Sequence, residues 1–150
     1  MKRLIKAVTS FFYLGHSPLM PGTVGSMGGL VIYFIVRENL PLYIFSTIFL
    51  FMLGMIFSAE AEKIYKRKDA KMIVIDEACG MMLSLLLVPY NIWLVISGFI
   101  LFRLLDITKP FPAKRIEKAS GAFGIMFDDI IVAVYTNIIL QLAASIFRLR

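Results

Sequence analysis

The chain has 150 residues, of which 59% are hydrophobic and 17% charged, whereas roughly 45–50% of a soluble domain is apolar. This length predicts one domain, residues 1–150, and a bilayer is the solvent that tolerates so much apolar surface. One cysteine and one histidine exclude a disulfide framework and clustered histidine metal sites. The net charge is +6, and apolar segments separate the basic residues, so they form no continuous basic face. This distribution favours contact with anionic lipid headgroups and argues against binding of nucleic acid.

Five apolar segments follow one another along the chain, and each is expected to form a helix. They are Val24–Val36, Leu42–Phe57, Ala78–Val88, Ile92–Leu105 and Ile130–Phe147. A helix needs about 20 residues to cross the hydrocarbon of a bilayer, so only the second and the last approach a full span. We expect an all-α, polytopic membrane bundle with four to five short transmembrane or re-entrant helices. Short helices also leave association into a homo-oligomer open.

Lysine and arginine concentrate before the first segment, in every second connection between segments and near the end of the fourth segment. They are Lys2, Arg3, Lys6, Lys63, Lys66, Arg67, Lys68, Lys71, Arg103, Lys109, Lys114, Arg115 and Lys118. Cytoplasmic loops of membrane proteins are enriched in these residues. The pattern therefore predicts that the N-terminus and these connections lie at the cytoplasmic face.

Acidic residues stand at the ends of the apolar segments. Asp76 and Glu77 precede the third segment, Asp106 follows the fourth, and Asp128 and Asp129 precede the fifth. Ionisable groups at membrane depth are costly and usually functional. Capping of a helix start explains one acid per terminus, but adjacent carboxylates repel each other.

Arg103 stands three residues before Asp106, so this pair alone has a purely structural interpretation as an ion pair on one helix face. For the five acids together, a shared cation is the better explanation. Carboxylate oxygens are hard ligands that select Mg²⁺ or a similar ion. We therefore expect Asp76, Glu77, Asp106, Asp128 and Asp129 to be metal ligands at the cytoplasmic face.

A segment rich in glycine and proline, Pro18–Gly29, leads into the first apolar segment. It resembles a helix start that receives an anion through free backbone N–H groups. Small residues also allow membrane helices to pack closely, so the segment has two interpretations.

Four motifs in this order resemble the phosphatidylglycerophosphatase A family. They are Ser17-Pro18-x-x-Pro21-Gly22-Thr23-Val24-Gly25-Ser26, Asp76-Glu77-x-x-Gly80-Met81, Phe102-Arg103-x-x-Asp106-x-x-Lys109-Pro110-x-Pro112 and Gly121-x-x-Gly124-Ile125-Met126-x-Asp128-Asp129. The resemblance implies a phosphatase of the inner (plasma) membrane that uses Mg²⁺ at the cytoplasmic leaflet. Its substrate would be phosphatidylglycerophosphate and its products phosphatidylglycerol and inorganic phosphate.

Roles for individual residues follow from this resemblance as hypotheses. Asp106, Asp128, Asp129 and Arg103 are the expected catalytic residues. Arg103 and Lys109 would hold phosphate oxygens, as basic groups do in phosphoryl transfer generally. Thr23, Gly25 and Ser26 would donate hydrogen bonds to the same phosphate.

Three alternatives stay open on the sequence. A metal-dependent phosphatidyl or phosphoalcohol transferase also uses acid pairs, but its spaced series of aspartates within one stretch is missing. A divalent-cation transporter places carboxylates at helix ends, yet these acids are expected at one side of the membrane. A lipid-binding protein without catalysis needs only the basic loops.

Overall fold

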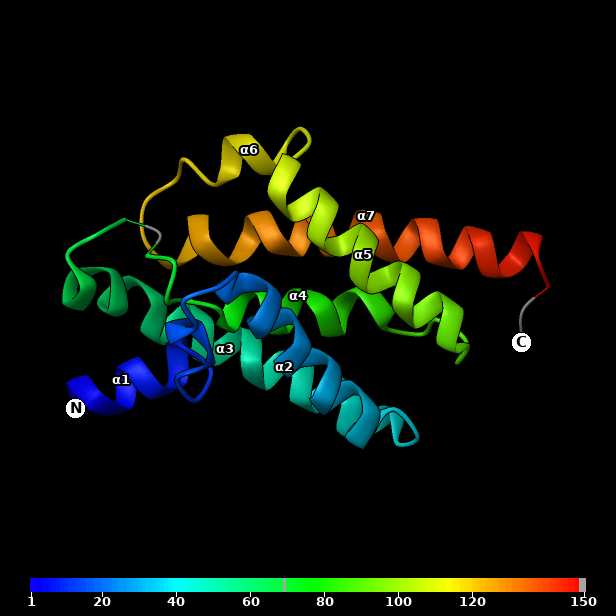
Figure 1. Ribbon diagram of the computed structural model, residues 1–150, viewed down its shortest axis with the longest axis horizontal. Coiled ribbons are helices and arrows are strands. Elements are labelled where there is room, and N and C mark those ends of the chain that lie inside the picture. Colours follow the sequence, from blue (N-terminus) through cyan, green and yellow to red (C-terminus); the bar gives the residue numbers. More distant parts are fainter. Residues whose placement is uncertain (69, 149–150) are drawn as a thin grey trace.

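The computed structural model describes residues 1–68 and 70–148, and every regular element in this part of the chain is a helix (Figure 1). The elements are α1 (Lys2–Thr9), the short 3-10 helix η1 (Leu14–His16), α2 (Pro21–Val36), α3 (Leu40–Tyr65), α4 (Ile75–Leu85), α5 (Ile92–Thr108), α6 (Ala113–Ile116) and α7 (Ala122–Ile146). The predicted all-α class is confirmed, and each of the five apolar segments lies largely in one helix. The sequence patterns did not predict α1 and α6.

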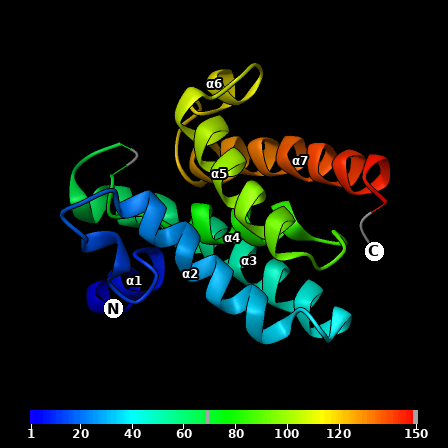
Figure 2. The same ribbon diagram turned by 45° about the vertical axis from the view of Figure 1, so that its right-hand side comes forward.

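Helix α4 is the centre of the bundle, with α2, α3, α5 and α7 packed around it (Figure 2). It has 11 residues, and most of its side chains are buried, Ala78, Met81 and Met82 completely. At 1.5 Å per residue it is about 16 Å long, roughly half the hydrocarbon thickness of a bilayer. Helix α4 is therefore enclosed by protein and is too short to cross a membrane by itself.

Two close contacts and one polar clamp hold α4 in place. A Cβ atom on Gly29 would overlap the carbonyl of Ala78, and one on Gly80 would lie 2.7 Å from the ring of Phe102. Glycine at these positions thus lets α2 and α5 approach α4 closely. From α7, Asn137 donates hydrogen bonds to carbonyl oxygens at the C-terminal end of α4, including that of Leu86 at 2.8 Å. These contacts fix the position of α4 relative to its neighbours.

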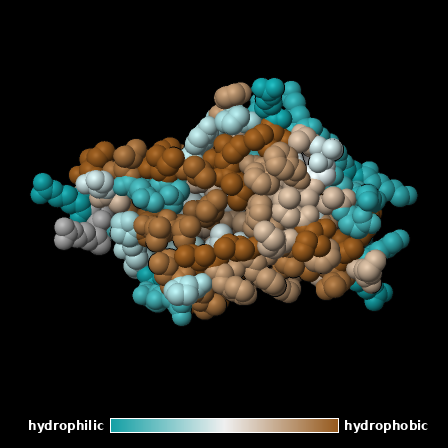
Figure 3. Space-filling view, turned by 180° about the vertical axis from the view of Figure 1, so that it is seen from behind, coloured by the Kyte–Doolittle hydropathy of each residue, from teal (hydrophilic) through white to brown (hydrophobic). Residues whose placement is uncertain are grey.

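Helices α3 and α7 are the two helices of the described residues that are long and apolar enough to cross a membrane. Only 22% of the most apolar stretch of α3 is buried inside the protein, against 50% for α7. The outer face of α3 exposes large apolar side chains such as Phe45, Ile48 and Met52, and apolar surface covers much of the face shown in Figure 3. An apolar surface of this extent marks contact with lipid or with another protein.

The start of the last helix differs from the prediction. Helix α7 begins at Ala122 instead of Ile130, after Gly121, whose φ of +71° ends the preceding loop. The residues Ala122–Phe127 form the first turns of this helix, which continues without a break through Asp128 and Asp129. Asp128 and Asp129 consequently lie inside α7, beyond its first turn, and the expectation that they precede the helix is wrong.

Candidate active site

A pocket of about 520 Å³ opens where α2 and α4 begin and where α5 ends. Its lining residues include five acids and three basic residues: Met20, Pro21, Gly22, Lys71, Ile73, Asp76, Glu77, Arg103, Asp106, Ile107, Lys109, Glu117 and Asp129. We call this space the carboxylate pocket. It brings together residues from the first turn of α2, from α4, α5 and α7, and from the loops after α3 and α5.

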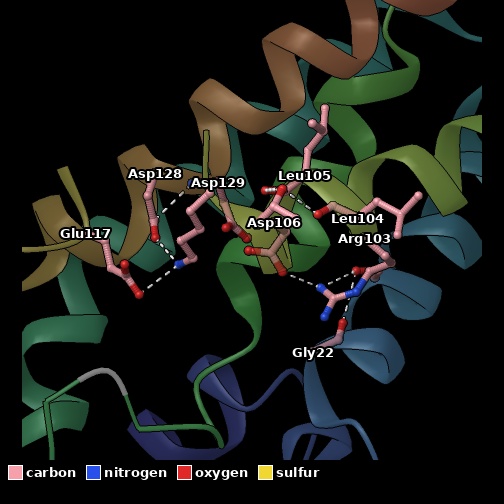
Figure 4. Close-up of polar contacts among 11 residues, drawn as sticks. Gly22, Arg103, Leu104, Leu105, Asp106, Glu117, Asp128 and Asp129 are labelled. Carbon is pink, nitrogen blue, oxygen red and sulfur yellow. Dashed lines mark hydrogen bonds and ion pairs between the residues drawn. The ribbon is translucent and has the colours of Figure 1, made fainter. Parts of the chain in front are cut away.

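Three carboxylates meet in this pocket although they are far apart in the sequence. Asp76 and Glu77 belong to the first turn of α4, and Asp129 comes from α7. One oxygen of each lies within 4.8 Å of the other two. Asp106, in the last turn of α5, is within side-chain hydrogen-bonding reach of Asp129. The labelled side chains of Asp106 and Asp129 lie close to each other in Figure 4.

Buried oxygens in this cluster have no hydrogen-bond donor among the described residues. They are Oε2 of Glu77 and Oδ2 of Asp129. Burying a carboxylate oxygen without a partner is costly, and a bound cation would remove that cost. Because three carboxylates supply hard oxygen ligands within one small volume, the donor set of Asp76, Glu77 and Asp129 fits a divalent ion such as Mg²⁺.

Arg103 lies at the wall between α5 and α2. Its Nη1 donates to Oδ2 of Asp106 at 2.7 Å and to Oγ of Ser26 at 3.4 Å, so the ion pair that the sequence suggested is present. A Cβ atom on Gly22 would lie 2.9 Å from Nη2 of Arg103 and would overlap the carboxylate of Glu77. The absence of a side chain at Gly22 thus makes room for the guanidinium at the edge of the pocket (Figure 4).

Lys109 ends α5 in a left-handed conformation with a φ of +42°. Its Nζ donates to Oδ2 of Asp128 and lies 3.3 Å from Oε1 of Glu117. Burial by itself would lower the pKa of Lys109, but the carboxylate of Asp128, with Asp129 and Asp106 nearby, raises it above its ordinary value. The lysine is therefore held as a cation beside the three-carboxylate cluster.

The structure gives Asp128 a different environment from the other acids. It accepts from Lys109 and, through Oδ1, from the backbone N–H of Asp129 at 2.9 Å. It is not one of the three carboxylates that share a small volume. Its geometry is that of a residue that orients Lys109, which differs from the metal-ligand role expected from the sequence.

The three residues at the start of α2 that were expected to bind phosphate have different surroundings. Gly25 packs against Val74, where a Cβ atom would lie 2.7 Å from that side chain, so its smallness serves helix packing. Ser26 donates to the carbonyl of Gly22 at 3.0 Å and accepts from Arg103, which makes it a support for the arginine. The buried hydroxyl of Thr23 has no hydrogen-bond partner among the described residues.

Among the pocket residues that sequence reasoning missed are one glycine and two charged residues. Gly22 belongs to the motif before α2 but was not proposed as a binding residue. Lys71 and Glu117 lie in loops, where charged residues are expected on general grounds, so no local pattern distinguished them. Only the fold brings them to the carboxylate pocket.

Comparisons with known proteins agree with the motifs. Residues 7–144 match the family model for phosphatidylglycerophosphatase A. A Bacteroides thetaiotaomicron protein with the provisional name phosphatidylinositol-3-phosphatase is 34% identical over 88% of both chains. The phosphatidylglycerophosphatase A of Escherichia coli is 34% identical over 82% of this chain and 73% of its own, and that of Haemophilus influenzae is 36% identical over 79% and 76%. No solved structure matches the chain significantly.

Proposed function

The chain belongs to the phosphatidylglycerophosphatase A family, and from this premise we propose that it hydrolyses the terminal phosphate monoester of phosphatidylglycerophosphate to give phosphatidylglycerol and inorganic phosphate. The observation that carries the proposal is the carboxylate pocket, in which Asp76, Glu77 and Asp129 meet opposite Arg103 and Lys109. A phosphate monoester needs cations around its oxygens and an acceptor for the proton of water. The pocket offers both within one space.

We further propose that Asp76, Glu77 and Asp129 hold Mg²⁺, with Asp106 next to them. The support is the close approach of the three carboxylates and the unpartnered oxygens of Glu77 and Asp129. When bound, such an ion offsets the negative charge of the phosphate and polarises its oxygens.

The protein's own side chains have separate roles in this proposal. Arg103 and Lys109 bind phosphate oxygens, and Ser26 and Asp128 hold them in position. Thr23, whose hydroxyl is free to donate, and the backbone N–H groups of the first turn of α2 add hydrogen bonds to the phosphate.

Hydrolysis replaces the bond between phosphorus and the glycerol oxygen by a bond to the oxygen of water. The water loses a proton, and the leaving glycerol oxygen gains one. We assign Asp106 as the carboxylate that accepts the proton of water, because it lines the pocket and contacts both Arg103 and Asp129.

We place the protein in the inner (plasma) membrane, crossed at least by α3 and α7, with the pocket at the cytoplasmic face. The length and apolar composition of these two helices support the crossings. The basic residues of α1, of the end of α3 and of α6 belong to segments in the same half of the molecule as the start of α2 and the end of α5 (Figure 1), which border the carboxylate pocket. Enrichment of lysine and arginine is the mark of the cytoplasmic side.

A second lipid is favoured by one observation, the relative named as a phosphatidylinositol-3-phosphatase. Phosphatidylinositol 3-phosphate and phosphatidylglycerophosphate both carry a phosphate monoester on a polyol headgroup. The pocket residues described above contact a phosphate in either case, so the headgroup must be tested directly.

The test is the release of inorganic phosphate by purified full-length protein in detergent, with each of the two lipids and phosphatidic acid, in the presence of Mg²⁺ and after EDTA. We expect the fastest release from phosphatidylglycerophosphate, loss of release to background after EDTA, and recovery when Mg²⁺ is restored. Faster release from phosphatidylinositol 3-phosphate would change the substrate, and unchanged release in EDTA would remove the metal from the proposal. No release from any lipid would refute the phosphatase activity itself.

A further inference from the structure

A second charged pocket lies between the start of α1 and the end of α3, and it shares no lining residue with the carboxylate pocket. Its volume is about 510 Å³, and its lining residues are Lys2, Arg3, Lys6, Glu60, Lys63, Ile64 and Lys66. The one acid among them, Glu60, is paired with Lys63 at 2.9 Å. The remaining cations give this space, which we call the basic pocket, a strong attraction for an anion.

The wall contributed by α1 is anchored to the protein. Ile5 and Thr9 are buried against the bundle, and the ammonium of Lys6 lies 5.1 Å from the centre of the Tyr65 ring, at the end of α3. A cation over an aromatic face is stabilised by about 0.5–1 kcal/mol at an exposed site. Helix α1 thus has an apolar side toward the protein and a basic side along the pocket, as interfacial membrane helices do.

An apolar groove of about 240 Å³ lies between α3 and the residues at and just after the end of α1. Its lining includes Phe11, Phe12, Phe45, Ser46, Phe49 and Leu53. On α3, the step from Leu53 in the groove to Glu60 in the basic pocket is about 10 Å of helix. Figure 3 shows hydrophilic surface at the right-hand end of the molecule and apolar surface next to it.

From this arrangement we propose that the basic pocket and the apolar groove together bind one anionic diacyl phospholipid, with its phosphate among the lysines and an acyl chain in the groove. Charge complementarity selects the anionic headgroup, and the aromatic and aliphatic lining of the groove selects a hydrocarbon chain. The carboxylate cluster that we assign to hydrolysis lies in the other pocket, so the lipid bound here is not a substrate. The site adds an anionic-lipid ligand to the proposed phosphatase and does not depend on its activity.

The headgroup half of the proposal is tested by counting bound lipids on full-length protein in detergent by native mass spectrometry. The probes are dioleoyl phosphatidylglycerol and dioleoyl phosphatidylcholine. The variant Lys6→Gln/Lys63→Gln/Lys66→Gln removes charge from the basic pocket, and the matched control Lys114→Gln/Arg115→Gln/Lys118→Gln removes as much from the α6 region. We expect at least a tenfold weaker affinity for one bound phosphatidylglycerol in the first variant and less than a twofold change in the control.

Retained phosphate release by the first variant will show that it is folded and that its effect is separate from the carboxylate pocket. Equal weakening in both variants would mean a general effect of surface charge and would overturn the site. Equal binding of phosphatidylcholine to the unmodified protein would overturn the selection for anionic lipid.

The groove half of the proposal is tested with Ser46→Trp, which fills the groove, and Ile48→Trp, which adds the same side chain to the exposed face of α3 outside it. We expect Ser46→Trp to weaken phosphatidylglycerol binding at least fivefold and Ile48→Trp to leave it within twofold. Excess glycerol phosphate, which has the headgroup but no chains, should not displace the lipid. Displacement by glycerol phosphate, or no effect of Ser46→Trp, would refute a site for a diacyl lipid.

Discussion

Helices α3 and α4 are both rich in apolar residues, but they lie in different surroundings. Helix α3 exposes a row of large side chains along its outer face, whereas α4 is enclosed and carries Asp76 and Glu77 at its start. The apolar residues of α3 suit contact with lipid or with another protein, and those of α4 form the core that holds two carboxylates in position. Apolar residues of similar composition therefore form an exposed surface in α3 and a buried support for the carboxylate pocket in α4.

If the carboxylate pocket at the start of α4 is the active site, loss of one of its carboxylates should lower phosphate release the most. We expect Asp129→Asn to lower phosphate release by about 10³-fold, because it removes a charge from the proposed metal ligands while keeping the side-chain size. The control is Glu38→Gln, an exposed acid after the far end of α2, which should keep full activity. Release by Asp129→Asn within tenfold of the unmodified protein, with an unchanged melting temperature, would remove Asp129 from the mechanism.

A smaller effect is expected at the arginine that contacts α2. Arg103→Lys keeps the positive charge but loses the planar guanidinium that reaches both Asp106 and Ser26. We expect phosphate release to fall by about 10- to 100-fold at saturating Mg²⁺. Arg37→Lys, which changes an arginine that stacks on Tyr90 outside the site, should change release less than twofold, and an equal loss in both variants would contradict the assignment.

The smallest effect on activity is expected from substitutions outside the pocket that compare a buried position of α4 with an exposed position of α3. Met82→Ala empties a fully buried position of α4 and should lower the free energy of unfolding by about 2–5 kcal/mol. Ile48→Ala, on the outer face of α3, should change it by no more than about 0.5 kcal/mol. Chemical unfolding in detergent measures both values, and activity per folded molecule should stay within twofold. If Ile48→Ala destabilised the protein as much as Met82→Ala does, the outer face of α3 would be buried against another protein chain.

The helices were predictable because apolar runs and their polar connections are local features. Each of the five predicted segments lies largely in a helix, and the four motifs point to the family that the comparisons show. The boundary of α7 was missed because Ala122–Phe127 reads equally well as loop or helix without its neighbours. The sequence did not predict which apolar segment is enclosed by the others, because only the packing of the helices reveals that α4 is surrounded.

By itself, the sequence determined the all-helical class, the family and the residue types available for the chemistry, since these depend on composition and on motifs of adjacent residues. The tertiary structure decided which acids share a volume. It brought Asp76, Glu77 and Asp129 together, turned Asp128 toward Lys109 and gave Gly25 to helix packing. The physical reason is that distances between side chains on different helices are set by how those helices pack, and the close approach of α2, α5 and α7 to α4 is a property of the assembled core.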